Sequence, residues 1–268
     1  ARTSARRVTP LPVTVICELM GVPVADRDLF GPWSSAAGRL LDGLLDEATT
    51  MEGLTGAMQI INYFNTLFEE RRVEPRDDLV SALLAVEEEG DRLNEQELRM
   101  ITLLLFIAGH ETTMNLIGNG TKALLEHPDQ LRRLAEDPSL AASAVEELLR
   151  FDGPVHLTGR IATAEVEVGG QRFEPGDQVI TLLAAANRDP ERFADPDTLD
   201  VGRNDPHHLA FSHGIHYCLG ASLARVEGQV AIGELIRRFP DLQLVTEAPA
   251  YREHFVLRGL RELRVSLR

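Results

Sequence analysis

Cysteine, lysine and tryptophan are scarce in this chain of 268 residues, which has two cysteines and one tryptophan. Cys17 and Cys218 lie about two hundred positions apart, so the sequence has no disulfide framework of the kind that supports small secreted domains. Lys122 is the only lysine among 27 basic residues. The cysteine usage fits a reducing cytoplasm, which is the location we expect.

Positive charge is also in short supply. The chain has 27 basic and 42 acidic residues, for a formal net charge of -15. This charge argues against sequence-independent binding of nucleic acid. The sequence shows no signal-peptide pattern and no apolar run near twenty residues, so we expect no membrane span. A hydrophobic content of 44% allows a sizeable core within one large domain.

Hydrophobic periodicity predicts a mainly α fold with a minor antiparallel β-sheet. Helical patterns cover 13–20, 26–33, 58–72, 77–88, 95–126, 139–150 and 219–239. Residues 43–55 are glycine-containing and are expected to form a loop. Short alternating segments predict strands at 165–168, 171–173, 179–183, 242–245 and 263–265, with a proline-punctuated meander at 187–205.

The longest predicted helix begins at Asn94, a good N-cap, with Glu97 completing a capping-box-like pair. At ~1.5 Å per residue the helix would span roughly 45–50 Å. It is apolar on nearly every side over 101–107, so we expect it to be buried. The motif Ala108-Gly109-His110-Glu111-Thr112-Thr113 interrupts it. By itself that motif is equally typical of a helix that emerges into solvent at His110.

A second motif, Phe211-Ser212-His213-Gly214-Ile215-His216-Tyr217-Cys218-Leu219-Gly220, stands where a loop turns into a helix. Leu219, Leu223, Val226 and Val230 follow at helical spacing. Unpaired N–H groups and the helix dipole favour a thiolate at such a position, so Cys218 is suited to metal binding. Gly214 suits a turn with positive φ, Gly220 permits close approach of a flat group, and Phe211 can shield the sulfur.

Two other interpretations of this motif remain open. Cys218 could be a buried structural cysteine at a loop–helix junction. The second alternative is zinc, because the segment offers suitable ligands: His207, His208, His213, His216 and Cys218. None of the usual paired ligand spacings is present, which counts against zinc.

Three motifs occur in one order: Ala-Gly-x-Glu-Thr-Thr, then Glu147-x-x-Arg150, then Phe-x-x-Gly-x-x-x-Cys-x-Gly. In this order and spacing the chain resembles the cytochrome P-450 superfamily, in its soluble bacterial branch. The resemblance implies that Cys218 is the thiolate ligand of a haem b iron. It implies that Thr112 stabilises bound dioxygen, that Glu111 relays protons, and that Ala108 and Gly109 leave room for dioxygen and substrate.

The resemblance also assigns supporting residues. Arg160 and His216 become partners of the haem propionates, for which guanidinium geometry is well suited. Glu147 and Arg150 become structural residues that tie the core to the segment before the cysteine loop. Without the resemblance, that pair would be a surface ion pair worth well under about 1 kcal/mol.

The implied function is a haem-thiolate monooxygenase that inserts one oxygen atom from O₂ into a small organic substrate. The haem would lie between the central helix and the Cys218 loop. Electrons would come from a ferredoxin or flavodoxin with its reductase, docking on the Cys218 side where Arg225 and His213 offer positive charge. Thr112 and Glu111 argue against the peroxide-driven variant of this chemistry.

The resemblance describes residues 1–268 as a single haem-thiolate domain that lacks the family's N-terminal third. Its helical parts would be 8–160 and 206–240, and its β-rich parts 161–205 and 241–268. The family's Trp-x-x-x-Arg motif is absent, because the only tryptophan is Trp33 and position 37 is alanine. Two rival functions follow: a haem-free inactive fragment, or a metal-binding module at the His207–Cys218 cluster.

Overall fold

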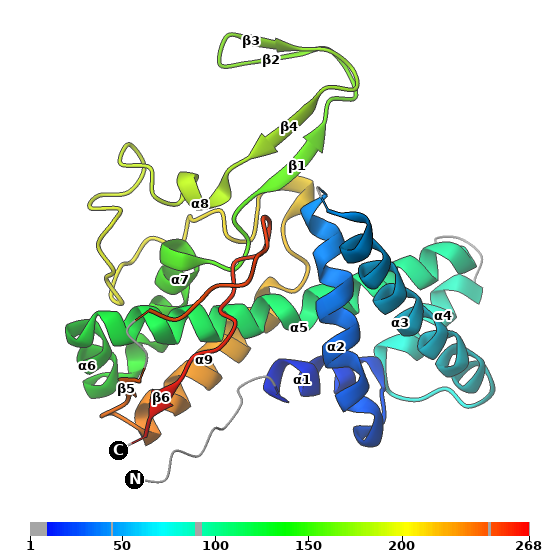
Figure 1. Ribbon diagram of the computed structural model, residues 1–268, viewed down its shortest axis with the longest axis horizontal. Coiled ribbons are helices and arrows are strands. Elements are labelled where there is room, and N and C mark those ends of the chain that lie inside the picture. The colour runs from blue at the N-terminus through cyan, green and yellow to red at the C-terminus, as the bar shows by residue number, and fades with distance from the viewer. Residues whose placement is uncertain (1–9, 44, 89–92, 246–247, 268) are drawn as a thin grey trace. The chain divides into compact units, whose positions relative to one another are not determined.

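The computed structural model describes residues 10–43, 45–88, 93–245 and 248–267, and within them the chain forms two compact units. The N-terminal unit lies within residues 4–114, and the C-terminal unit runs from Asn115 onward. Helix α5 (Glu95–Glu126) contributes its first part to one unit and its last part to the other. Helices dominate and the described strands pair antiparallel, so the predicted fold class is confirmed (Figure 1).

The N-terminal unit is helical throughout its described part. Its elements are α1 (Pro10–Met20), α2 (Arg27–Gly38), α3 (Glu47–Val73), α4 (Leu79–Glu88) and the start of α5, with 3-10 turns at Val24–Asp26 and Arg39–Asp42. Three fully buried rings form the centre of its core. Phe30 lies 4.4 Å from Phe106 and 5.9 Å from Phe64, between ring centroids. This cluster packs one face of α5 against α2 and α3.

Helix α3 corrects the expectation that residues 43–55 form a loop. The helix begins at Glu47, because the side chain of Asp46 accepts a hydrogen bond of 2.7 Å from the Thr49 N–H and caps it. Gly53 lies in the segment that was expected to be a loop, and Gly56 follows it directly. A Cβ at Gly56 would lie 2.5 Å from the Trp33 carbonyl oxygen, so the residue serves the close packing of α3 on α2.

Helix α5 begins as predicted. The Asn94 N–H donates to Glu97 at 2.8 Å and the Glu97 N–H donates to Asn94 at 3.0 Å, which is a complete capping box. By length and composition α5 is also the one helix of the described residues that could cross a membrane, contrary to the sequence expectation. The buried polar residues His110, Asn115 and Asn119 are instead typical of a helix inside a protein core.

The C-terminal unit contains the end of α5 and four further helices in its described part, with 3-10 turns at Pro138–Leu140 and Gly214–His216. The helices are α6 (Pro128–Glu136), α7 (Ala141–Asp152), α8 (Leu183–Ala186) and α9 (Ala221–Arg238). Leu116 of α5, Val145 of α7 and Ile232 of α9 belong to one buried hydrophobic cluster. Of these helices, the sequence analysis missed α6 and α8.

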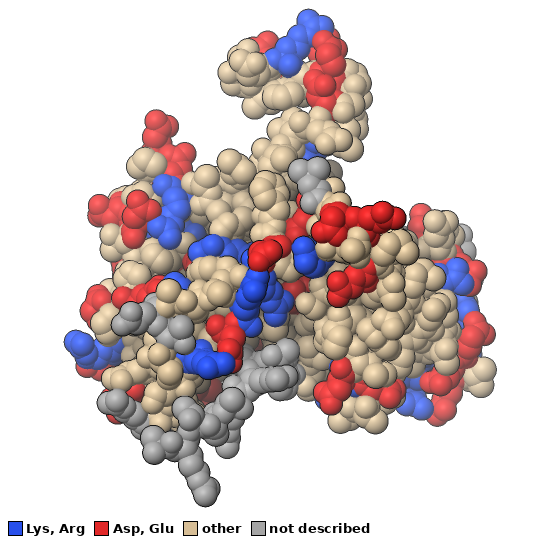
Figure 2. All heavy atoms as spheres, viewed as in Figure 1, with Lys and Arg blue, Asp and Glu red and all other residues tan. Residues whose placement is uncertain are grey.

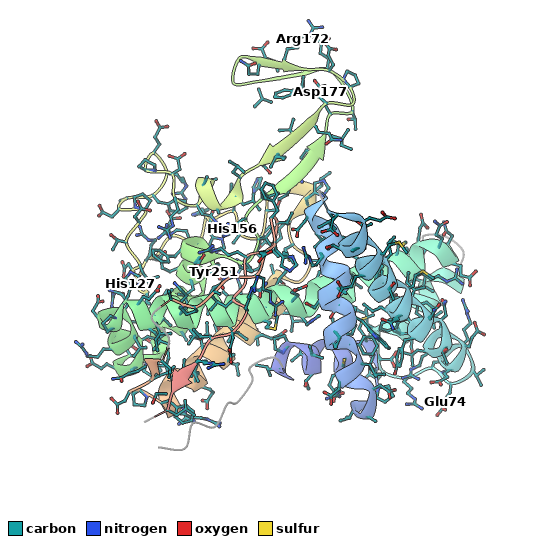
Figure 3. All side chains as sticks on the ribbon, in the orientation of Figure 1. Glu74, His127, His156, Arg172, Asp177 and Tyr251 are labelled. Atoms are coloured by element: carbon teal, nitrogen blue, oxygen red, sulfur yellow. The ribbon has the colours of Figure 1, made fainter. Side chains whose placement is uncertain are left out.

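The described strands form three separate antiparallel pairs. They are β1 (Thr158–Ile161) with β4 (Gln178–Thr181), β2 (Val166–Val168) with β3 (Gln171–Phe173), and β5 (Gln243–Leu244) with β6 (Val265–Ser266). Gly169 and Gly170 make the turn of the β2–β3 hairpin, both with positive φ, as predicted. The hairpin extends beyond the β1–β4 pair and carries both signs of charge (Figures 1 and 2). Arg172, labelled in Figure 3, pairs with Glu165 and Glu174.

The C-terminal segment is fastened to the end of α7 by a polar cluster. The Arg258 guanidinium lies 3.7 Å from the centroid of the Tyr251 ring and donates to Asp152 at 2.7 Å. Tyr251 donates to the same carboxylate at 3.3 Å, and His156 lies 4.0 Å from it (Figure 3). Burial, followed by the neighbouring charge of Arg258, lowers the pKa of His156.

Glu147 and Arg150 of α7 form a buried ion pair, with both side chains fully inaccessible. Arg150 donates to Glu147 at 2.7 and 2.9 Å and to the carbonyl oxygens of three residues in the meander, Asn187, Pro196 and Thr198. The Asp200 N–H donates to Glu147 at 2.9 Å. The pair therefore holds the meander that precedes the cysteine loop, in agreement with the structural role implied by the resemblance.

Arg150→Met should destabilise the protein by about 3–5 kcal/mol, because it leaves the Glu147 carboxylate buried without its main partner. The measurement is the free energy of unfolding in urea. Arg133→Met is the matched control, since Arg133 and Asp200 form an ion pair that is roughly half exposed; there we expect a loss below about 1 kcal/mol. Equal losses for the two variants would contradict the assignment.

Helix α9 spans the predicted residues, but it buries a different face from the one that its leucine and valine stripe suggested. Leu219, Val226 and Val230 are more than half exposed. The buried face includes Glu227, which is 5% exposed, and neither of its carboxylate oxygens has a hydrogen-bond partner among the described residues. This burial raises the pKa of Glu227 from 4.5 to about 7.

Glu227 should make stability fall as the pH rises. The folded state holds the proton more tightly than the unfolded state, so the contribution of the neutral acid is present below pH 4.5 and is lost through the window up to about pH 7. Glu227→Gln should therefore gain up to about 3 kcal/mol relative to wild type between pH 5 and pH 8. Urea unfolding at the two pH values measures this, with the exposed Glu234→Gln as control. A pH-independent difference would contradict the assignment.

Candidate functional site

The Cys218 loop lies immediately before α9 in the C-terminal unit. The Cys218 N–H donates to the Phe211 carbonyl oxygen at 2.9 Å, and the Ala221 N–H donates to the Cys218 carbonyl oxygen at 3.2 Å. Gly214 has φ +67°, the positive φ that the sequence predicted for it. Its carbonyl oxygen accepts a hydrogen bond of 3.0 Å from the Tyr217 N–H and closes a turn. The backbone thus fixes the cysteine at both ends while leaving its side chain outside the helix.

The side chains of residues 213–220 are all exposed, including Cys218 itself. Ile215 is 97% exposed and Leu219 is 85% exposed. Nothing lies within 4 Å of the position that a Cβ would take at Gly220. A buried structural cysteine is therefore ruled out for Cys218, and the thiol lies on an uncovered apolar surface.

Cys17 shows the contrast. It is fully buried in α1, as the sequence analysis expected for a packing residue. Burial raises the pKa of its thiol to about 12, so Cys17 is a neutral, unreactive side chain.

The histidines near Cys218 do not converge on one point. His207 pairs with Asp205 at 2.9 Å, and His208 lies 3.1 Å from Glu146. His213 and His216 are exposed. In the part of the chain that the structure describes, no three His, Cys, Asp or Glu side chains are arranged to hold a metal ion. The zinc alternative therefore has no ligand set there.

Arg160 and His216, the predicted partners of carboxylates, lie in the same unit as Cys218. Arg160 on β1 donates to the Thr158 hydroxyl and to the Gly159 carbonyl oxygen. No carboxylate among the described residues forms an ion pair with Arg160, although most of the described arginines form such a pair. The His216 side chain has no hydrogen bond to another described residue. Both side chains thus keep their capacity to bind an external carboxylate.

Phe211 is buried, and its carbonyl oxygen accepts the Cys218 N–H, while shielding of the sulfur by its ring stays a prediction. Arg225 departs from the sequence expectation. Arg225 was expected to offer positive charge to a docking partner. It donates two hydrogen bonds to the Glu146 carboxylate, at 2.6 and 2.9 Å, so its charge is already neutralised.

The Ala-Gly-His-Glu-Thr-Thr motif lies on α5 within the N-terminal unit. His110 is 3% exposed and Glu111 is 1% exposed, so the helix does not emerge into solvent there. The His110 ring nitrogen lies 3.1 Å from the Ser34 hydroxyl of α2. Thr112 donates to the Ala108 carbonyl oxygen at 2.8 Å, the i−4 bond that its position allowed.

One stripe of α5 is uncovered, which corrects the expectation of burial on nearly every side. Met100, Leu104 and Ala108 follow one another at four-residue spacing and are exposed. Thr112 is next in this series and is half-buried. Ala108 and Thr112 therefore continue the exposed stripe of Met100 and Leu104, whereas Glu111 lies on the packed side of the helix.

Glu111 packs closely against α2. A Cβ at Gly38 would lie 2.4 Å from a carboxylate oxygen of Glu111, so the absence of a side chain at position 38 defines the space for this acid. A Cβ at Gly109 would lie 2.7 Å from the tip of Ile16. The glycine at 109 therefore serves the packing of α5 on α1 in addition to any role on the exposed side.

The predicted residues thus form two groups. Phe211, His216, Cys218 and Gly220 share one loop, with Arg160 in the same unit, and Ala108, Gly109, Glu111 and Thr112 share one helix in the other unit. The sequence analysis gave no role to Glu146, which binds His208 and Arg225, or to the Tyr217 hydroxyl, which binds Arg225, and it considered His208 only as a zinc ligand. The one available signal for Glu146 was its position next to Glu147 of the Glu-x-x-Arg motif.

Gly38→Ala should destabilise the protein even though alanine has the higher helix propensity, because its methyl group would displace Glu111. Glu111→Ala should remove most of that cost, so a double-mutant cycle on urea unfolding should give a coupling of about 0.5–3 kcal/mol. Gly31→Ala in the same helix meets nothing within 4 Å and should not destabilise. Additive single-variant losses would show that the two residues are not coupled.

Comparison with known proteins gives a consistent result. The cytochrome P450 family model matches residues 48–258. The vitamin D(3) 25-hydroxylase of Pseudonocardia autotrophica is 49% identical over 261 residues, covering 96% of this chain and 63% of that protein. The 6-deoxyerythronolide B hydroxylase of Saccharopolyspora erythraea is 44% identical over 261 residues, with 96% and 63% covered.

Solved structures agree. P450BioI in complex with hexadec-9Z-enoic acid ligated acyl carrier protein aligns with a TM-score of 0.92 and 42% identity, covering 97% of this chain and 67% of that one. Mycobacterium smegmatis CYP164A2 aligns with a TM-score of 0.91 at 42% identity. The chain spans less than two thirds of the length of the two hydroxylases.

Proposed function

Because the chain belongs to the cytochrome P450 family, we propose that the protein is a haem-thiolate monooxygenase in which Cys218 ligates the iron. The observation that carries this proposal is the Cys218 loop. Its backbone is fixed by the hydrogen bond to Phe211, while its thiol and the flanking apolar side chains are exposed. An uncovered apolar surface around a positioned thiol suits a flat apolar cofactor with a soft metal.

Haem, when bound, supplies the redox chemistry by which one atom of O₂ enters an organic substrate. The protein's part is to hold the group and to manage protons. Arg160 and His216 would bind the propionates, since neither has a carboxylate partner among the described residues. The open space at Gly220 would leave room for a flat group beside the loop.

On α5 we assign proton handling to Thr112 and Glu111. The Thr112 hydroxyl already donates to the Ala108 carbonyl, so its oxygen lone pairs are free to accept a proton or a hydrogen bond. Glu111 lies on the packed side of the helix, where Gly38 leaves it room, and can hold a proton away from bulk water. The small side chains of Ala108 and Gly109 leave space for dioxygen and substrate.

The exposed stripe of α5 and the relatives support a proposal for the substrate class. Met100, Leu104 and Ala108 are apolar and exposed, which favours an apolar organic molecule. Two relatives are named for hydroxylation of vitamin D(3) and 6-deoxyerythronolide B. We propose a small organic substrate of this kind.

The proposed electron source is a ferredoxin or flavodoxin with its reductase, and the proposed location is the cytoplasm of a bacterium. Because Glu146 neutralises Arg225, His213 is the one residue of the two expected at the docking surface that stays available to the redox partner.

The test is the carbon monoxide difference spectrum of the dithionite-reduced protein, with and without added haemin. We expect a red-shifted thiolate-type Soret band that is lost in Cys218→Ala and retained in the control Cys17→Ala. Retention of the band in Cys218→Ala would disprove the ligand assignment. Absence of haem uptake by the wild type would favour the haem-free alternative.

A further inference from the structure

The Cys218 loop has very few side-chain anchors. Of the described residues 213–220, only Tyr217 makes a side-chain hydrogen bond, in which its hydroxyl accepts from Arg225 at 3.0 Å. Ser212, just before the loop, has φ +62°, a left-handed conformation that is unfavourable for a residue with a side chain. Something outside the loop must therefore hold this backbone in place.

Arg225 of α9 is the centre of the contacts that do so. Its guanidinium donates to Tyr217, donates twice to Glu146 of α7, and lies 4.5 Å from the centroid of the Phe211 ring. Phe211 provides the carbonyl oxygen that accepts the Cys218 N–H. One guanidinium thus contacts residues at both ends of the loop segment that positions the cysteine.

His208 completes the arrangement from the other side of Glu146. The Ala210 N–H donates to Nδ1 of His208 at 3.2 Å, so Nε2 carries the proton and donates to Glu146 at 3.1 Å. The His208 side chain is buried, and its ring lies 5.9 Å from Phe211. Burial alone would raise the pKa of Glu146, but hydrogen bonds from His208 and Arg225 outweigh it and hold the pKa at about 2.

We propose that Glu146, His208, Tyr217 and Arg225 form a loop brace, a set of positioning residues that fixes the Cys218 N–H on Phe211 and sets the electrostatic field at the cysteine sulfur. This inference rests on the proposed function, because it assigns the brace to a sulfur that ligates iron. Glu146, His208 and Arg225 act on the ligand through Phe211 and Tyr217, and all four members of the brace are positioning residues.

The charge balance of the brace gives it a signature that packing alone lacks. Glu146 and Arg225 neutralise one another beside the loop. Removing the acid leaves an uncompensated positive charge, which stabilises the reduced iron and raises its reduction potential. Removing the arginine leaves an uncompensated negative charge, which lowers the potential. The two substitutions should therefore shift the potential in opposite directions.

The first experiment needs no haem. Tyr217→Phe removes one hydroxyl from a half-exposed side chain and should leave the protein folded. Loss of that anchor should speed hydrogen exchange of the Cys218 amide about three- to tenfold, as expected for one hydrogen bond. Tyr251→Phe, which loses a hydroxyl contact to Asp152 elsewhere in the unit, should leave Cys218 exchange unchanged.

The second experiment measures the reduction potential of the haem-loaded protein at pH 8, where histidine is ordinarily neutral. Glu146→Gln should raise the potential and Arg225→Gln should lower it. Glu234→Gln and Arg237→Gln are the controls, because they break an exposed Glu–Arg pair farther along α9 and should cause no shift.

Opposite shifts together with faster Cys218 exchange support the brace. Wild-type exchange in Tyr217→Phe, or shifts of the same sign in the two charge variants, would overturn it even if the thiolate-type Soret band is present. If the wild type takes up no haem, the proposed function fails, and the exchange experiment still decides whether the brace positions Cys218.

Discussion

The buried ion pair between Glu147 and Arg150 is the interaction on which the rest of the C-terminal unit depends. Both side chains are inaccessible to solvent, and Arg150 directs its remaining donors to three carbonyl oxygens of the meander. A buried charge pair is not in itself a source of stability, because desolvation opposes the Coulomb attraction. Its value here is specificity, because one guanidinium satisfies three backbone carbonyl groups of an irregular segment that has little hydrophobic periodicity. The chain that leads into the cysteine loop is fixed by that means.

The neighbouring acid, Glu146, also holds a segment that is distant in the sequence. Glu147 binds the meander, whereas Glu146 binds His208 and Arg225 on the two sides of the cysteine loop. Successive residues of α7 point about 100° apart, so two adjacent acids can serve two different segments. Because the loop side chains are exposed, they contribute little to holding their own backbone, and the polar contacts of the proposed brace set its conformation. On this proposal the cysteine loop is held in one conformation without being buried.

Local patterns were reliable where a single segment determines its own structure. The capping box at Asn94, the Gly169-Gly170 turn and the limits of α9 follow from backbone chemistry within a few residues. Predictions from local patterns failed where contacts with another helix determine the structure. Residues 43–55 were expected to form a loop, and the use of Gly53 and Gly56, which is the close approach of α2, is not visible in the sequence of α3 alone. The stripe of Leu219, Val226 and Val230 predicted the helix correctly but not the face that is packed, since the buried residues of α9 are Ala221, Glu227, Gly228, Ile232 and Ile236.

The sequence by itself determined the chemistry: a cysteine in a glycine-bounded loop before a helix, an acid and a threonine within a long helix, and the order of the three motifs. Those signals are local, because each depends on residue types within one or two turns of chain. The tertiary structure alone decided what surrounds them. Arg225 lies 79 positions from Glu146, and the bond between them converts an expected docking charge into an internal brace. Periodicity carries no information about contacts at that separation, because which charged side chain finds which partner is settled only when the helices pack.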